Sequence, residues 1–207
     1  MPLVQLLDYA SVLIFALTGA LVASRAQLDL VGFAFFACLT GVGGGTLRDV
    51  LLDRNPVFWI GNPTYLLVGC GAAIAVFFTA HRLESRYTAI VWLDAVALGV
   101  AVAAGSSIAA GLGHHPVIVL VMGIATGCAG GLARDVVANE VPLVLKQGEL
   151  YVTCALAGSL ATVGAQVLDL SPAIGAVTCA AVTFGLRAGS IGLGWRLPVY
   201  KPRPPRT

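Results

Sequence analysis

Charged residues are scarce in this sequence. Asp, Glu, Lys and Arg together make up 11% of the 207 residues, apolar types make up 58%, and the mean hydropathy is +0.91. Soluble domains contain about 25% charged residues, so this composition excludes an ordinary soluble domain. The formal net charge of +2 is small and gives no indication of a nucleic-acid-binding surface.

Long polar segments are also missing. The polar connections are short, such as HRLESRY at 81–87 and GLGHH at 111–115. Seven apolar runs approach the roughly 20 residues that a helix needs to cross a bilayer. The sequence therefore predicts one all-α polytopic membrane domain over 1–193, with seven transmembrane helices. The runs lie at 3–23, 30–52, 65–80, 88–109, 116–138, 151–168 and 172–193.

The sequence lacks recognisable catalytic and metal-binding patterns. The glycine-rich stretch lacks the Lys-Ser/Thr ending of a P-loop and follows no strand. Outside the apolar runs, no acid–base or nucleophile–base pair stands out. We therefore expect no enzyme activity, no metal and no cofactor. The cysteines show no paired metal-ligand spacing and are interpreted as packing residues; they are Cys38, Cys70, Cys128, Cys154 and Cys179.

Lys and Arg are unevenly distributed among the connections. The first apolar run has no basic flank and is long enough to span, so we expect it to remain in the mature protein rather than act as a signal peptide. With the N-terminus outside, most basic residues lie in the cytoplasm, and Arg54 is the main exception. The sequence therefore predicts an outside N-terminus and a cytoplasmic C-terminus, with a basic, Pro-rich tail at 194–207. The basic residues on the predicted cytoplasmic side are Arg25, Arg82, Arg86, Lys146, Arg196, Lys201, Arg203 and Arg206.

The chain repeats itself when it is aligned with a copy shifted by 86 residues. The first unit covers 3–80, the second covers 88–168, and the run at 172–193 has no counterpart. Because each unit has three spans, the second must enter the membrane from the opposite side. We therefore expect two inverted three-helix repeats plus a seventh helix, an arrangement found in proteins that move solutes. Matched pairs include Asp8 with Asp94, Gly19 with Gly105, Thr40 with Thr126, Gly44 with Gly130, Arg48 with Arg134, Asp49 with Asp135 and Tyr65 with Tyr151.

Glycine is concentrated in the middle of one predicted span, in the stretch TGVGGGTLRDVL at 40–51. Gly43, Gly44 and Gly45 fall near mid-bilayer, and Gly130 and Gly131 recur at the equivalent place in the second unit. Inside a helix, each glycine costs about 1 kcal/mol relative to alanine. Close helix packing is one explanation. The density and recurrence of the glycines favour another, a kink that faces a water-filled path.

An Arg-Asp pair follows each glycine run. Arg48-Asp49 and Arg134-Asp135 would lie towards opposite mouths of a central path, where they would gate or filter ions. The alternative is that these side chains extend to the membrane interface. Neighbouring helix positions do not face each other, so we do not expect the two members of a pair to share one face of an intact helix.

Four further polar residues are candidates for lining such a path. Asp8 and Asp94 open their spans, where stabilisation of the helix N-terminus is the more common role, although both could also concentrate cations. Thr18 and Ser106 lie deeper in their spans. Hydroxyl groups in membrane helices often bond back to their own backbone, which is the alternative for these two.

Two stretches, GVGGGTLRDVL and GCAGGLARDVV, lie in two three-span units that are followed by a lone last helix. This pattern resembles the prokaryotic branch of the trimeric intracellular cation (TRIC) channel family. The resemblance covers nearly the whole chain through residue 193, and the duplicated glycine-rich Arg-Asp motif is its most specific part. It implies a channel in the plasma (inner) membrane of a prokaryote.

The resemblance also implies a homotrimer surrounded by membrane lipids, with no nucleic acid partner. Each protomer would carry its own pathway for monovalent cations, potassium or sodium, where the kinked second and fifth helices approach. The kinks would be Gly43-Gly44-Gly45 and Ala129-Gly130-Gly131, and Ala129 departs from the triple glycine. Related sequences are also described as glycine-transporter-like, so a small-solute permease with alternating access is the alternative function.

Overall fold

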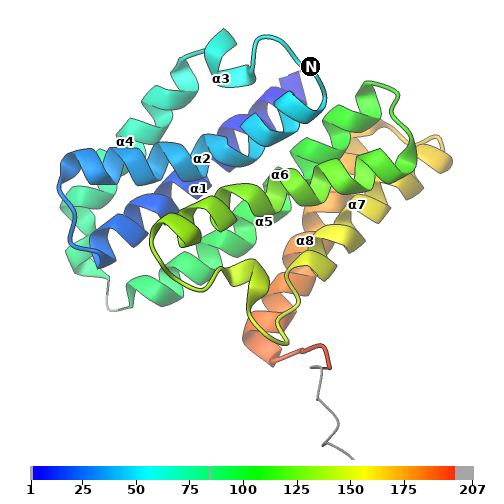
Figure 1. The fold of residues 1–207 in the computed structure, drawn as a ribbon. Coiled ribbons are helices and arrows are strands. Elements are labelled where there is room, and N and C mark those ends of the chain that lie inside the picture. Colours follow the sequence, from blue (N-terminus) through cyan, green and yellow to red (C-terminus); the bar gives the residue numbers. More distant parts are fainter. Residues whose placement is uncertain (1, 84, 199–207) are drawn as a thin grey trace, which may run out of the picture.

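The computed structural model describes residues 2–83 and 85–198, and the regular structure in these residues is almost entirely helical (Figure 1). Each predicted apolar run forms a helix, with ends that differ by at most two residues. A short helix, α3, was not predicted. The helices are α1 (Pro2–Arg25), α2 (Leu30–Leu51), α3 (Phe58–Gly61), α4 (Thr64–Thr79), α5 (Arg86–Gly111), α6 (Pro116–Val137), α7 (Val152–Val167) and α8 (Pro172–Leu193), with 3₁₀ turns η1 (Ala80–Arg82) and η2 (Leu143–Leu145).

Within the described residues, six helices are long and apolar enough to cross a membrane, and α7 is a shorter apolar helix. The chain is thus an all-helical polytopic membrane protein. Most of the predicted basic tail, including Lys201, Arg203 and Arg206, lies outside the described residues. The described end of that segment folds back, because the amide of Leu197 donates to the carbonyl of Gly148 at 2.9 Å.

Local sequence explains where the helices begin and turn. Asp29 caps α2 by accepting from the amide of Gly32 at 2.8 Å, and Ser171 caps α8, whose first residue is proline. Chain reversal after α2 uses Asp53 with φ 50°, and reversal after α6 uses Asn139 with φ 55°. Asp and Asn tolerate this left-handed conformation better than other non-glycine residues, so the turn chemistry recurs at equivalent positions.

Four helices, α1, α2, α5 and α6, form the centre of the molecule. Helix α4 packs against α1 and α2 on one side, as Figure 1 shows, while α7 packs against α5 and α6 on the other. Helix α8 lies against α5 and α7. The central contact between α2 and α6 joins the two glycine-rich runs.

Glycine allows the backbones of α2 and α6 to touch. A Cβ atom at Gly44 would overlap the carbonyl oxygen of Thr126, and a Cβ at Gly130 would overlap that of Thr40. These two contacts are equivalent under the shift that aligns the chain with itself. Both helices are continuous through their glycines. The glycines therefore do serve close packing, and a kink stays a prediction.

We expect Gly44→Ala and Gly130→Ala to destabilise the protein, because each added methyl group must push α2 and α6 apart. Overpacking of this kind costs about 1–3 kcal/mol. The matched control is Gly71→Ala on α4, where an added Cβ meets no other atom within 4 Å. Thermal unfolding of the detergent-solubilised variants measures the effect. Equal unfolding midpoints for all three variants and the parent would contradict the packing role.

Candidate functional site

Three arginine side chains, Arg48, Arg134 and Arg187, are completely buried. A guanidinium group removed from water is tolerated only when acidic or polar groups surround it. Two of these residues belong to the predicted Arg-Asp motifs. Neither of those two reaches the surface, so the alternative in which they extend to the membrane interface is wrong.

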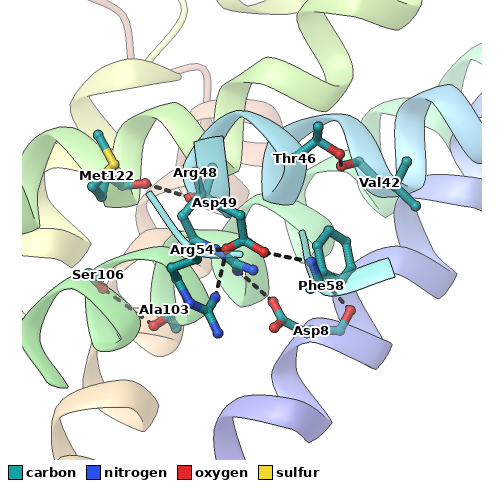
Figure 2. Close-up of polar contacts among 12 residues, drawn as sticks. Asp8, Val42, Thr46, Arg48, Asp49, Arg54, Phe58, Ala103, Ser106 and Met122 are labelled. Atoms are coloured by element: carbon teal, nitrogen blue, oxygen red, sulfur yellow. Dashed lines mark hydrogen bonds and ion pairs between the residues drawn. The ribbon is translucent and has the colours of Figure 1, made fainter. Parts of the chain in front are cut away.

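Arg48 on α2 lies between two carboxylates (Figure 2). Its Nη1 is 2.7 Å from Oδ1 of Asp8 on α1, and its Nε is 2.8 Å from Oδ1 of Asp49. Asp49 also accepts from Nη1 of Arg54 at 2.7 Å and from the amide of Phe58 at 2.9 Å. We call Asp8, Arg48, Asp49 and Arg54 the first ion cluster. It ties α1 to the end of α2 and to the start of α3.

Arg134 on α6 has an equivalent set of partners. Its Nη1 is 3.0 Å from Oδ1 of Asp94 on α5 and 2.7 Å from Oγ1 of Thr18 on α1, and its Nε is 2.7 Å from Oδ1 of Asp135. Asp135 accepts from the amide of Leu143 at 2.9 Å, and the hydroxyl of Tyr151 donates to Oδ2 of Asp94 at 2.7 Å. The second ion cluster consists of Thr18, Asp94, Arg134, Asp135 and Tyr151.

One sequence prediction about the Arg-Asp pairs is wrong in both clusters. Adjacent residues were not expected to share a helix face, yet each arginine binds the aspartate that follows it. The motifs lie in the last turn of their helices, where a long arginine side chain can fold back beside its neighbour.

Asp8 and Asp94 do not act mainly as helix N-terminal residues. Asp94 lies well inside α5, which begins at Arg86, and Asp8 lies in the second turn of α1. Each is instead the inter-helix partner of a buried arginine. The prediction that favoured N-terminal stabilisation is therefore wrong.

The structure brings Thr18 into the second ion cluster, although Thr18 belongs to the first repeat unit. Its hydroxyl also donates to the carbonyl of Phe15 at 2.7 Å, so Thr18 matches the backbone-bonding alternative as well. The structure does not bring Ser106 there. The Ser106 hydroxyl donates to the carbonyl of Val102 at 2.7 Å and lies 3.0 Å from the hydroxyl of Thr162 on α7. Ser106 thus matches the backbone-bonding alternative.

The remaining glycines lie at the helix crossing or beside the clusters. A Cβ at Gly43 would lie 3.5 Å from Cα of Gly130 at the crossing. A Cβ at Gly45 would be 2.6 Å from the ring of Phe58, whose amide binds Asp49 of the first ion cluster. A Cβ at Gly131 would lie 3.3 Å from Oδ1 of Asp94, so this run packs directly against the second ion cluster.

Three cavities border the first ion cluster. One, of about 460 Å³, is lined by Arg54 and by residues of α1, α5 and α8. Another, of about 240 Å³, is lined by Asp8, Arg54 and Tyr65 among others. The third has a volume of only about 10 Å³ and is lined by Asp8, Gly44 and Thr126 among others. A volume of this size holds about one water molecule. The space next to the α2–α6 crossing is therefore nearly filled.

Sequence reasoning missed three residues of these networks. Arg54 was noted only as an exception to the charge distribution, yet it binds Asp49. Tyr151 was matched with Tyr65 without a role. Arg187 was overlooked, although a single arginine inside the apolar run at 172–193 is itself a signal of a buried partner.

Comparison with known proteins agrees with this architecture. A family model described as glycine transporter matches the chain twice, at residues 5–81 and 91–166. The UPF0126 inner membrane protein YadS of Escherichia coli K12 is 34% identical over 206 residues, which cover 96% of each chain.

Solved structures match as well. The TRIC trimeric intracellular cation channel orthologue from Rhodobacter sphaeroides is 41% identical, with a TM-score of 0.91, over 94% of this chain and 100% of that one. Another prokaryotic TRIC channel, crystallised in 0.5 M KCl, is 28% identical, with a TM-score of 0.86, over 92% and 96% of the two chains. The chain therefore belongs to the family of TRIC channels, as its duplicated glycine-rich Arg-Asp motif predicted.

Proposed function

We propose that this protein is a channel for monovalent cations, with potassium as the main ion and sodium as a second, and that each protomer carries its own pathway between α2 and α6. The observation that carries this proposal is the pair of buried ion clusters beside the α2–α6 crossing. The similarity of this chain to the Rhodobacter sphaeroides TRIC cation channel supports the proposal. The similar proteins with solved structures are channels rather than enzymes. We propose no cofactor beyond the transported ion.

The positions of the two clusters fit one path with two constrictions. Asp8 and Thr18 both lie on α1 and belong to different clusters. They are ten residues apart, which corresponds to about 15 Å along a helix. The crossing of Gly44 with Thr126 and of Gly130 with Thr40 joins the two glycine runs that lie beside these clusters. A cation moving along α1 would therefore meet a guanidinium group twice.

The first ion cluster holds two guanidinium groups and two carboxylates, whereas Arg134 alone faces two carboxylates in the second. In this closed arrangement the arginines occupy the carboxylate oxygens that would otherwise bind a cation. Movement of Arg48 away from Asp8 would expose a carboxylate that attracts a cation instead. The Nη2 atoms of Arg48 and Arg134 have no hydrogen-bond partner among the described residues. A buried donor without a partner costs about 1–3 kcal/mol, which favours rearrangement of the arginine. We propose that Arg48, Asp49, Arg134 and Asp135 gate the path and that Asp8 and Asp94 attract the ion.

Opening must separate α2 from α6. We propose that Gly43, Gly44 and Gly45 in α2, and Gly130 and Gly131 in α6, bend to allow this, because glycine weakens a helix locally. Thr18 would line the path at the second ion cluster. The hydroxyl of Ser106 bonds to Val102 and lies beside Thr162, outside both clusters, so we do not propose that Ser106 lines the path.

We propose that α7 also spans the membrane, so that 3–80 and 88–168 form two inverted three-helix repeats and 172–193 a seventh helix. The double match of one family model supports this. The protein would be a homotrimer in the inner membrane of a prokaryote, with lipids around it and its C-terminus in the cytoplasm. A reporter fused to the C-terminus that is active only in the cytoplasm tests the orientation, and a periplasmic signal would reverse it.

A small-solute permease is the second candidate, because the matching family model is described as glycine transporter. A permease binds its solute near the boundary between its repeats. The cavity of about 10 Å³ at the α2–α6 crossing admits neither an amino acid nor a hydrated cation in this conformation. The similarity to solved TRIC cation channels is what favours the channel.

We expect the purified protein in a planar bilayer to give discrete openings that carry potassium. Under a potassium chloride gradient, the reversal potential should lie close to that of potassium, because the carboxylates favour cations. Saturable uptake of a small solute into liposomes without unitary currents would favour the permease. A reversal potential near that of chloride would contradict the cation pathway.

We expect Arg48→Gln to raise the open probability, because Asp8 then loses the guanidinium group that ties it to α2. Arg25→Gln is the matched control, since Arg25 pairs with Glu140 at 3.1 Å and both side chains are about one third exposed. Single-channel recording measures both. Loss of a buried charge can destabilise the fold, so Asp8→Asn provides a milder change and should lower selectivity for potassium over chloride. Unchanged gating in Arg48→Gln together with unchanged selectivity in Asp8→Asn would remove this cluster from the mechanism.

A further inference from the structure

Helix α8 carries the third buried arginine, and it has no counterpart in the repeat. Nη2 of Arg187 is 2.7 Å from Oε2 of Glu149, which lies in the loop before α7. The Nε and Nη1 atoms are buried without a hydrogen-bond partner in the part of the chain that the structure describes. Arg187 is therefore held mainly by one carboxylate and by what its flat face contacts.

That face lies against the ring of Tyr151. The guanidinium carbon of Arg187 is 5.0 Å from the ring centroid, within the range of a cation–π interaction. The hydroxyl of the same tyrosine donates to Oδ2 of Asp94, whose Oδ1 binds Arg134. A continuous chain of contacts thus runs from α8 to the second ion cluster.

The first ion cluster has no such support among the described residues. Tyr65, the residue matched with Tyr151, stacks on Tyr9 with ring centroids 4.0 Å apart and meets Phe58 edge-on. Its hydroxyl makes no hydrogen bond to Asp8 in the described structure. The Asp8 side chain is 10% exposed, whereas that of Asp94 is completely buried. The two clusters therefore differ in how firmly their inter-helix carboxylate is held.

The loop that carries Glu149 is itself fastened to the end of α8. The amide of Leu150 donates to the hydroxyl of Ser190 at 3.2 Å, and that hydroxyl donates to the carbonyl of Trp195 at 3.1 Å. A backbone bridge also joins Glu149 to Arg196. A displacement of α8 would consequently be transmitted to Glu149 and Tyr151.

We propose that Arg187 is a positioning residue for the second ion cluster: through its contacts with Glu149 and Tyr151, α8 holds the Tyr151 hydroxyl on Asp94 and so keeps this cluster closed. This inference rests on the proposed function and adds a role for the helix outside the repeat. It makes the two constrictions unequal, since only the second is coupled to α8.

A double-mutant cycle tests the coupling. Arg187→Gln and Tyr151→Phe, each made in the full chain, should raise the open probability in planar bilayers by about fivefold, the change that corresponds to about 1 kcal/mol. If Arg187 acts through the tyrosine hydroxyl, the double variant should equal Tyr151→Phe alone. If Arg187→Gln instead acted through a general loss of stability, it would change the open probability in the parent protein and in Tyr151→Phe alike. Tyr87→Phe, which removes an exposed hydroxyl bonded to Lys146 outside both clusters, is the matched control and should leave gating unchanged.

If Arg187→Gln does not fold, Glu149→Gln repeats the test, because it removes the ion pair with Arg187 without replacing the arginine itself. Unchanged gating in the Arg187 or Glu149 variant, with normal currents from the parent protein, would overturn this inference alone. Additive effects in the double variant would overturn it too. A parent protein without any current would overturn the proposed function and this inference together.

Discussion

The requirement that a buried guanidinium group be paired governs the arrangement of the central helices. Arg48 fixes α2 to α1 through Asp8, and Arg134 fixes α6 to α5 through Asp94 and to α1 through Thr18. Removing one partner from a buried pair typically costs about 3–5 kcal/mol, so these contacts restrict how the helices can pack. The same pairs place charged groups beside the helix crossing, where the proposed ion path would pass. Under the proposed function, stability and ion control depend on the same side chains.

Glycine makes this arrangement possible, because it brings the backbones of α2 and α6 into contact beside the two clusters. Any side chain at Gly44 or Gly130 would hold the helices apart. Glycine also weakens a helix locally, and this is the property that the proposed opening would use. The third arginine, Arg187, adds a contact to one cluster only, and this breaks the symmetry that the repeat would otherwise impose.

The sequence predicted the helices well, because hydropathy over 20 residues depends only on local composition. The repeat also identified Arg48, Asp49, Arg134 and Asp135 as a related set. It did not reveal that Asp8 and Asp94 bind the arginines, because each contact joins residues that are 40 positions apart in the chain and lie on different helices. Nor did it show what Tyr151 binds, because its counterpart Tyr65 makes different contacts. It did not show what Arg187 binds, because α8 has no copy with which to compare it.

Accessibility of Thr126 to a small, water-soluble thiol reagent tests the central claim most directly, because Thr126 lines the cavity of about 10 Å³ at the α2–α6 crossing. Thr126→Cys would be recorded in a chain whose five native cysteines have been replaced, with the cysteine-free chain as control. If cations pass between α2 and α6, a positively charged methanethiosulfonate reagent should reach this cysteine and progressively block the current. A steady current in both proteins, with mass spectrometry showing the cysteine unmodified, would place the path elsewhere.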